Sequence, residues 1–212
     1  YQSAEIEYFL GNAEPAVVVC SPKNLTWVTQ VAKKTGTKHV FTLGDDRSGS
    51  LLEKAAGLSD RFKTVRRADD DLAAILYTSG TTGRSKGAML THGNLGSNAK
   101  VLQKFWAWKK GDVLLHALPI FHVHGLFVAS HGALLNGSKM IWLPRLDTKE
   151  LIKHMPRSTV MMGVPTFYVR LLLDPAFTKQ TAKNMRLFIS GSAPLLTETF
   201  NSFKERIGQR YF

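Results

Sequence analysis

The chain has 212 residues, of which 44% are hydrophobic and 21% charged, and this globular composition excludes a disordered, collagen-like or coiled-coil protein. With 28 Lys and Arg against 16 Asp and Glu the formal net charge is +12, yet the cations are scattered along the chain and form no basic block. We therefore expect an anionic small molecule as partner, and no nucleic acid.

Short β-branched runs alternate with longer amphipathic runs along the whole chain. The predicted strands cover residues 16–20, 38–42, 72–77, 88–91, 113–117, 140–143, 160–163 and 187–190. The predicted helices cover residues 3–10, 24–34, 94–108, 122–135, 148–155, a segment that starts at Pro165, and 197–207. Helices between strands predict crossover connections, so the expected fold is α/β, with predominantly parallel sheet layers and helices on both faces.

The first part of the chain is expected to form a small unit of its own. Residues 59–68 are polar, basic and without hydrophobic periodicity, so they are predicted to connect a βα segment at 1–68 to a second βα segment at 69–212. The strand at 16–20 is expected to be buried, together with Leu25, Val28 and Val31 of the following helix. The single cysteine, Cys20, is predicted to be a buried and inert thiol that makes no internal disulfide.

Residues 113–138 contain no Asp, Glu, Lys or Arg, so this segment is long enough to span a membrane. It also contains four histidines, Pro119 and several glycines, and it lacks aromatic belts, so we predict that it does not span. No secretory signal is visible at the N-terminus. Because the chain starts with Tyr1 instead of Met, we expect it to be part of something longer, and the sequence gives no indication of the oligomeric state.

The loop at 77–87, YTSGTTGRSKG, combines three glycines, several hydroxyls and Lys86. Glycines let backbone amides converge on one point, and a lysine adds a mobile positive charge, which together suit a polyphosphate. It is not a Walker A loop, because Lys86 follows Ser85 and precedes Gly87. A solvated loop between two strands is the alternative reading of this composition.

Two histidines follow the strand at 113–117, in the segment LPIFHVHG. The carboxyl ends of parallel strands are where open sheets bind ligands, so His122 and His124 are candidate site residues. A metal site is possible for His-x-His, but no Cys, Asp or Glu lies within 113–138 to complete it. The other alternative is that the two histidines only have their hydrogen bonds satisfied at the start of a helix.

Arg170 stands among apolar residues in GVPTFYVRLL, and it therefore needs a partner. That partner is either an acidic side chain in a structural ion pair or the carboxylate of a substrate, which a guanidinium binds through two hydrogen bonds. Further on, FISGSAP at 188–194 is expected to be a strand that enters a tight turn. A loop that leads into the next helix, with Ser192 as a local cap, is the alternative to a functional role for this turn.

The segment TSGTTGRSKGAMLTH at 78–92 resembles the phosphate-loop signature of the adenylate-forming acyl-activating enzymes, a superfamily that includes the acyl-CoA synthetases. The resemblance extends over essentially the whole chain. It implies that the loop contacts the β- and γ-phosphates of ATP and that Thr78 helps to hold Mg²⁺. The residues implied in phosphate binding are Thr78, Ser79, Gly80, Thr81, Thr82, Gly83 and Lys86.

The other motifs extend the resemblance. The segment with His122 and His124 is similar to a second core motif of the superfamily, which implies that His122 lines the route of the acyl group and that His124 points into the carboxylate pocket. The implied catalytic residues are Lys86 and His122. The turn at 192–194 is implied to pass the adenine, through Ser192, Ala193 and Pro194.

The combination of HVHGLF, GVPTFYVRLL and RLFISGSAPL is similar to malonyl-CoA synthetases, which implies that Arg170 and Ser192 bind the second carboxylate of malonate. The implied activity is an ATP-dependent ligase that activates malonate as an acyl-AMP and transfers it to CoA. The implied partners are malonate, ATP, Mg²⁺ and CoA, and no membrane, with the cytoplasm as the expected location or the mitochondrial matrix as an alternative.

Other readings remain open. The alternative within the same superfamily is a ligase for another carboxylic acid, such as methylmalonate or a short-chain or aromatic acid. By resemblance the chain is a central piece of a large N-terminal domain, without that domain's start and without the C-terminal domain, so we expect it to be inactive alone. It is alternatively a catalytically dead nucleotide-binding fragment. A dehydrogenase is disfavoured, because no Gly-x-Gly-x-x-Gly follows a strand.

Overall fold

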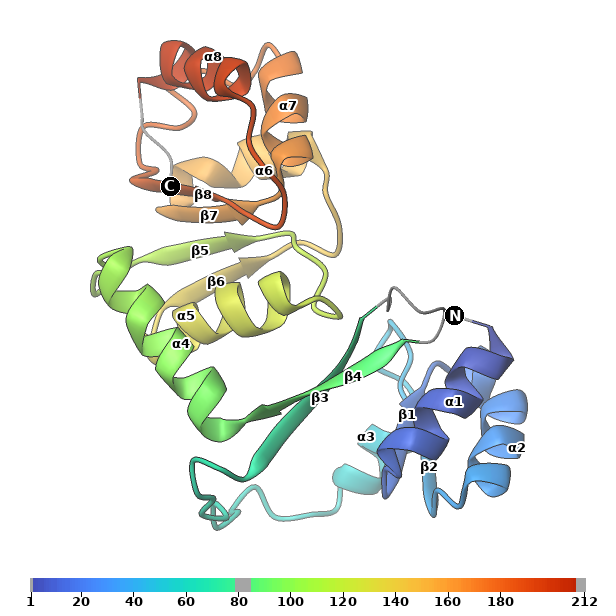
Figure 1. Cartoon of the computed structure of the whole chain (residues 1–212). Coiled ribbons are helices and arrows are strands. Elements are labelled where there is room, and N and C mark those ends of the chain that lie inside the picture. The colour runs from blue at the N-terminus through green and yellow to red at the C-terminus, as the bar shows by residue number, and fades with distance from the viewer. Residues whose placement is uncertain (1, 79–84, 209–212) are drawn as a thin grey trace. The chain divides into compact units, whose positions relative to one another are not determined.

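The computed structural model describes residues 2–78 and 85–208 (Figure 1). The chain divides into two compact units, residues 1–66 and residues 67–212.

The first unit is a small α/β layer. Its elements are α1 (Ser3–Ala13), β1 (Val17–Cys20), a 3₁₀ turn (Pro22–Asn24), α2 (Leu25–Thr35), β2 (His39–Thr42) and α3 (Ser50–Ala55). Strands β1 and β2 pair in parallel. Helix α3 was not predicted, and a hydrogen-bonded pair fixes its start: Ser50 N donates to Thr42 Oγ1 and Thr42 N donates to Ser50 Oγ, each at 3.0 Å.

Two expectations for this unit were wrong in part. The strand at 16–20 is not buried throughout, because Val17 and Val19 are each 46% exposed. In α2, Val28 and Val31 are buried as expected, but Leu25 is exposed and Ala32 takes its place in the core. Cys20 is only partly buried; that burial raises the pKa of its thiol, which favours the less reactive protonated form.

The second unit begins with an antiparallel hairpin. Strand β3 (Leu72–Thr78) pairs with β4 (Lys86–Thr91), so that Thr78 lies opposite Lys86. Strand β4 thus starts two residues before the predicted 88–91, and this pair departs from the parallel pattern expected for most strands. Helix α4 (His92–Phe105) follows directly, because Thr91 caps it by accepting a hydrogen bond from Asn94 N at 3.1 Å.

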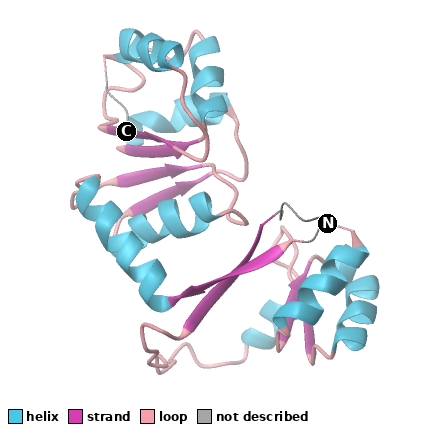
Figure 2. Cartoon of the chain, in the orientation of Figure 1, coloured by secondary structure: helices cyan, strands magenta, loops and turns pink. Residues whose placement is uncertain are grey.

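The remaining strands form a four-stranded parallel sheet in the order β6-β5-β7-β8 (Figure 2). The strands are β5 (Val113–His116), β6 (Lys139–Trp142), β7 (Val160–Gly163) and β8 (Leu187–Ser190), and the helices between and after them are α5 (His131–Leu135), α6 (Thr148–His154), α7 (Pro165–Leu173) and α8 (Thr197–Ile207). A 3₁₀ turn (Met155–Arg157) extends α6. The parallel sheet with crossover helices is the predicted fold.

The strand order reverses direction between β5 and β7. From β5 the chain moves to β6 at one edge, and then it returns past β5 to β7 and β8. Right-handed crossovers therefore place α5 on one face and α6 and α7 on the other. Figure 1 shows α4 and α5 as one group of helices and α6, α7 and α8 as another. No helix within the described ranges is long and apolar enough to cross a bilayer.

A π-helix occupies the first half of the predicted helix 122–135. It covers His124–Ser130 and continues into α5. At Gly125 the backbone lies so close to the preceding loop that a Cβ atom would meet the carbonyl oxygen of Pro119 at 2.2 Å. Single π-turns of this kind are frequent at functional sites.

Aromatic side chains fill the core of the second unit between β8, α7 and α8. The ring of Phe203 lies 4.9 Å from that of Phe188, 5.1 Å from that of Phe177 and 5.6 Å from that of Tyr168, measured between centroids. All four side chains are fully buried. The hydroxyl of Tyr168 donates to the carbonyl oxygen of Ile189, so its polar end is satisfied inside the core.

Replacing Tyr168 with phenylalanine is expected to lower the free energy of unfolding by about 1–2 kcal/mol, because the Ile189 carbonyl loses a buried donor while the ring packing stays. The midpoint of urea unfolding, followed by circular dichroism, measures this. An unchanged midpoint would show that the hydroxyl contributes nothing.

A buried ion pair joins the amino ends of β5 and β8. The carboxylate of Asp112 accepts two hydrogen bonds from the guanidinium of Arg186, one of them at 2.8 Å. It also accepts from Thr159 Oγ1 at 2.8 Å and from Lys109 N at 2.7 Å. Burial of Asp112 raises its pKa, but the hydrogen bonds from Arg186, Lys109 and Thr159 and the charge of Arg186 outweigh this and leave the pKa lowered.

Candidate functional site

A pocket of about 460 Å³ lies at the carboxyl ends of the parallel strands. The loop after β5 and the start of the π-helix form one wall, the start of α7 after β7 forms another, and the turn after β8 closes it. Its lining residues are Leu118, Pro119, His122, Val123, His124, Gly125, Val164, Phe167 and Ser192. This is the point where the strand order reverses, and open α/β sheets bind their ligands there.

His124 and Ser192 meet across this pocket. The Nδ1 atom of His124 lies 3.0 Å from Ser192 Oγ. Ser192 has a φ angle of 67°, a left-handed conformation that non-glycine residues rarely adopt and that indicates local strain. The preceding Gly191 lies close to the imidazole ring, because a Cβ atom at this position would meet His124 Cε1 at 3.0 Å. Burial lowers the pKa of His124, so its ring is neutral near pH 7 and offers one donor and one acceptor.

His122 lines the same pocket but is exposed, as is the neighbouring Phe121. Their ring centroids are 4.6 Å apart. The carbonyl oxygen of His122 accepts a hydrogen bond from Leu126 N at 3.0 Å, which places His122 just before the π-helix. The structure thus brings His122, His124 and Ser192 together.

A second, fully buried histidine lies behind the pocket. His116 ends β5 and is only 1% exposed. Burial is the main cause that lowers its pKa to about 4; the positive charge of a protonated His124 adds to this, and the Gly125 carbonyl partly opposes it. Its Nε2 atom lies 3.3 Å from the hydroxyl of Ser130, which in turn donates to the Gly125 carbonyl oxygen at 2.9 Å.

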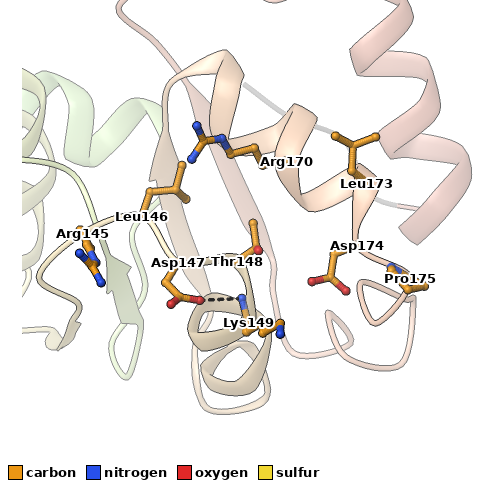
Figure 3. Close-up of a pocket in the computed structure, with 9 residues that line it drawn as sticks. All are labelled: Arg145, Leu146, Asp147, Thr148, Lys149, Arg170, Leu173, Asp174 and Pro175. Carbon is orange, nitrogen blue, oxygen red and sulfur yellow. Dashed lines mark hydrogen bonds between the residues drawn. The ribbon is translucent and has the colours of Figure 1, made fainter.

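Arg170 lies in a different cavity. It is exposed on α7 and lines an open cavity of about 990 Å³ together with residues of the β6–α6 loop and of α6. Figure 3 shows its guanidinium directed toward Leu146. The two carboxylates of this cavity accept backbone hydrogen bonds: Asp147 from Lys149 N and Glu150 N, and Asp174 from Ala176 N. Within the described chain no carboxylate forms an ion pair with Arg170.

Of the predicted phosphate loop, Thr78 and Lys86 are described at the ends of the β3–β4 hairpin. Both are exposed, and Thr78 Oγ1 lies 3.5 Å from the carbonyl oxygen of Lys86. The five residues predicted between them, Ser79, Gly80, Thr81, Thr82 and Gly83, lie outside the described residues. Ala193 and Pro194 follow Ser192 and are exposed.

A metal site built from histidines finds no support in the part of the chain that the structure describes. There, no group of three or more His, Cys, Asp or Glu side chains is arranged to hold a metal ion. Within residues 2–78 and 85–208, no third side chain joins His122 and His124 in such an arrangement.

Comparison with known proteins agrees with this geometry. Residues 1–212 match the profile of the family described as "AMP-binding enzyme". The chain belongs to the AMP-binding enzyme family. Its fold superposes on ATP-bound MatB from Rhodopseudomonas palustris with a TM-score of 0.94 and 52% identity, over 100% of this chain and 43% of that one.

Relatives of this AMP-binding enzyme include ligases for different acids. It is 32% identical to the mitochondrial malonate–CoA ligase of Bos taurus, over 95% of this chain and 36% of that protein. It is 35% identical to the long-chain-fatty-acid–CoA ligase of Bacillus subtilis, over 88% of this chain and 34% of that protein. The chain thus spans less than half the length of each of these three proteins.

Sequence reasoning missed three residues that shape the site of this AMP-binding enzyme. His116 and Ser130 lie in the charge-free run 113–138, which contains several polar residues, and no local pattern distinguishes these two from the others. Gly125 is needed because the chain passes Pro119 closely, and that approach depends on tertiary structure. The neighbouring motif residues His122 and His124 were the only signal that pointed to this segment.

Proposed function

We propose that this chain is part of an ATP-dependent ligase that joins malonate to CoA through a malonyl-AMP intermediate. The observation that carries the proposal is the pocket at the carboxyl ends of the sheet, where His122, His124 and Ser192 converge. The 52% identity to MatB, whose complex with ATP is known, and the similarity to malonate–CoA ligases support it.

The reaction has two steps. A carboxylate oxygen of malonate bonds to the α-phosphorus of ATP while the bond to the bridging oxygen breaks, which releases pyrophosphate. The sulfur of CoA, after loss of its proton, then bonds to the acyl carbon, and AMP leaves. Catalysis of such transfers depends mainly on positioning and charge neutralisation.

The residues of this chain divide that work between them. Lys86 and Thr78, with the loop between them, bind the phosphates of ATP, and the turn at Ser192, Ala193 and Pro194 passes the adenine. His122 lines the route of the acyl group. His124, which is neutral near pH 7, donates or accepts a hydrogen bond at the carboxylate without repelling a second cation.

Mg²⁺ is the metal ion that fits this proposal. The hydroxyl of Thr78, at the loop end of the β3–β4 hairpin, offers an oxygen ligand that would help to hold Mg²⁺, which prefers oxygen ligands from protein, water and phosphate. When bound, Mg²⁺ neutralises charge on the phosphates.

The second carboxylate of malonate is assigned to Arg170 and Ser192. Arg170 lies one helical turn after Phe167, which lines the pocket, so its long side chain needs to turn from the outer cavity toward Phe167. Because a monoacid has no second carboxylate, a substitution of Arg170 is the clearest test of whether malonate is the substrate.

To test the assignment, the chain replaces the matching segment of MatB from Rhodopseudomonas palustris. Acid-dependent AMP formation is then measured with ATP, Mg²⁺ and CoA, comparing malonate, methylmalonate, acetate, octanoate and benzoate. We expect preference for malonate from this graft and no turnover from the 212-residue chain alone. Malonate-dependent thioester formation by the isolated chain would contradict its assignment as an inactive piece.

In the same graft, Arg170→Leu is expected to raise the KM for malonate about 10-fold or more, since a charge-assisted hydrogen bond contributes about 1.5–3 kcal/mol. Arg145→Leu is the matched control, because Arg145 is a cation on the same outer cavity. An unaltered KM in Arg170→Leu would sink the dicarboxylate assignment and leave Arg170 as a surface residue.

A monoacid ligase is the second candidate. Leu118, Pro119, Val123, Val164 and Phe167 give the pocket a mainly apolar wall, which suits a short-chain or aromatic acid. Preference for acetate, octanoate or benzoate would favour this candidate and keep the adenylating mechanism.

A graft that activates no acid at all would point to a catalytically dead nucleotide-binding piece. The proposed location is the cytoplasm, with the mitochondrial matrix as the alternative; the ligase of Bos taurus is described as mitochondrial.

A further inference from the structure

His116 and Ser130 form a buried polar pair next to the pocket. The His116 ring stands perpendicular to the ring of Trp142 on the neighbouring strand, with centroids 4.4 Å apart and an interplanar angle of 82°. Ser130 is 5% exposed. A buried imidazole and a buried hydroxyl both require desolvation, so their presence calls for a reason beyond packing.

The hydrogen bonds indicate which ring nitrogen of His116 carries the proton. Ser130 has one hydroxyl proton, and it donates this proton to the carbonyl oxygen of Gly125 at 2.9 Å. Ser130 Oγ can therefore only accept from His116, so His116 carries its proton on Nε2. The Nδ1 atom of His116 is buried and has no hydrogen-bond partner among the described residues, which agrees with an unprotonated nitrogen at that position.

These bonds reach the pocket through one peptide group. The carbonyl of Gly125 belongs to the residue directly after His124, and Gly125 itself is held against the Pro119 carbonyl. The His116–Ser130 pair thus restrains the first turn of the π-helix from inside the protein. On the pocket side, the same turn presents the His124 ring to Ser192 Oγ at 3.0 Å.

We propose that His116 and Ser130 are positioning residues that hold the first turn of the π-helix so that the imidazole of His124 faces Ser192. This role deepens the proposed function, on which it rests in treating His124 as a residue of the carboxylate pocket. Neither His116 nor Ser130 lines that pocket.

The test follows the His124 ring directly, in the complete 212-residue chain with ¹⁵N-labelled histidine. Nuclear magnetic resonance reports the tautomer and ring-nitrogen shifts of His124 without any substrate. The variants are His116→Phe, which keeps a ring but loses the donor, and Ser130→Ala, which loses only the hydroxyl. Ser158→Ala is the matched control, because Ser158 is also buried and its Oγ donates to a helix carbonyl, that of His154, at 3.0 Å.

We expect the His124 shifts to move toward an averaged tautomer in His116→Phe and Ser130→Ala, and to stay unchanged in Ser158→Ala. His116→Gln, whose amide nitrogen can donate as Nε2 does, is expected to restore the original shifts. Unchanged His124 shifts in Ser130→Ala would overturn the proposal, and so would an equal change in Ser158→Ala. If His116→Phe does not fold, as judged by circular dichroism, Ser130→Ala and His116→Gln decide.

The readout needs no turnover, so the two proposals fail separately. If the His124 shifts contradict the positioning role, the proposed acid activation is still tested by the graft. If the graft does not activate malonate, the tautomer of His124 seen by nuclear magnetic resonance is still a valid result.

Discussion

Replacing Gly125 with alanine is expected to lower the free energy of unfolding of the second unit by about 3 kcal/mol, at the upper end of what overpacking costs. A Cβ atom at this position would lie 2.2 Å from the carbonyl oxygen and 2.8 Å from the carbonyl carbon of Pro119, and 3.2 Å from the carbonyl oxygen of Leu118. All three are backbone atoms, so no side-chain rotation relieves the clash. The loop that carries His122 must move instead, and with it one wall of the pocket.

Gly96→Ala provides the matched control. Gly96 lies inside α4, and a Cβ atom there would meet no other atom within 4 Å. This substitution is expected to raise the free energy of unfolding by about 1 kcal/mol, because alanine loses less backbone entropy than glycine in a helix. Urea unfolding of both variants measures the two effects. Equal effects of the same sign would show that the close approach to Pro119 relaxes without cost.

Replacing Arg186 with methionine is expected to lower the free energy of unfolding by about 3–5 kcal/mol, because it leaves the Asp112 carboxylate buried without its cation. Only 3% of the Asp112 side chain is exposed, against 24% of the Arg186 side chain, so the carboxylate is the more buried partner of the pair. Adding Asp112→Asn to Arg186→Met is expected to recover part of the loss, since a neutral amide costs less to bury.

The free energy of unfolding lost in Arg186→Met is expected to become smaller as the pH falls. The pKa of Asp112 is lowered in the folded chain, so its stabilising contribution is present above the unfolded pKa of about 3.9 and is lost as the pH falls through the folded pKa. Without Arg186, burial raises the pKa of Asp112, and the difference between the variant and the original chain narrows as the pH falls and both carboxyls become protonated. Thermal unfolding from pH 7 to pH 3 measures this trend.

Lys153→Met is the control for that series. Lys153 pairs with Glu150 at 2.9 Å, but its side chain is 65% exposed. Removing such a surface pair is expected to change stability by less than about 0.5 kcal/mol. A comparable effect of Lys153→Met and Arg186→Met would contradict the importance assigned to burial.

The regular elements of the second unit followed from local patterns. Strand β7 has the predicted bounds, and α7 starts at Pro165 as predicted, because Gly163 ends the strand and Pro165 favours the first turn of a helix. Local patterns did not indicate α3, whose start depends on the contact between Thr42 and Ser50. The exposure of Val17 and Val19 was equally invisible, since β-branched residues favour a strand whether or not a layer covers it.

The site was predicted in outline, through motifs rather than geometry. The sequence brought His122, His124 and Ser192 forward, and the structure places them around one pocket. It also brought Arg170 forward, but the direction of a long side chain on an exposed helix face is not encoded in its neighbours. The ion pair between Asp112 and Arg186 joins residues far apart in the chain, and nothing local marks either residue as buried.

The position of β5 has a consequence for synthesis. This strand is the first of the four to leave the ribosome, yet it lies between β6 and β7, and Leu114 and Leu115 end with no exposed surface. Until β7 has been made, one edge of β5 has no partner, and an unpaired apolar edge readily pairs with another chain. We therefore expect the yield of folded protein to depend on how quickly translation proceeds from β5 to β7, so that slow codons between them favour aggregation.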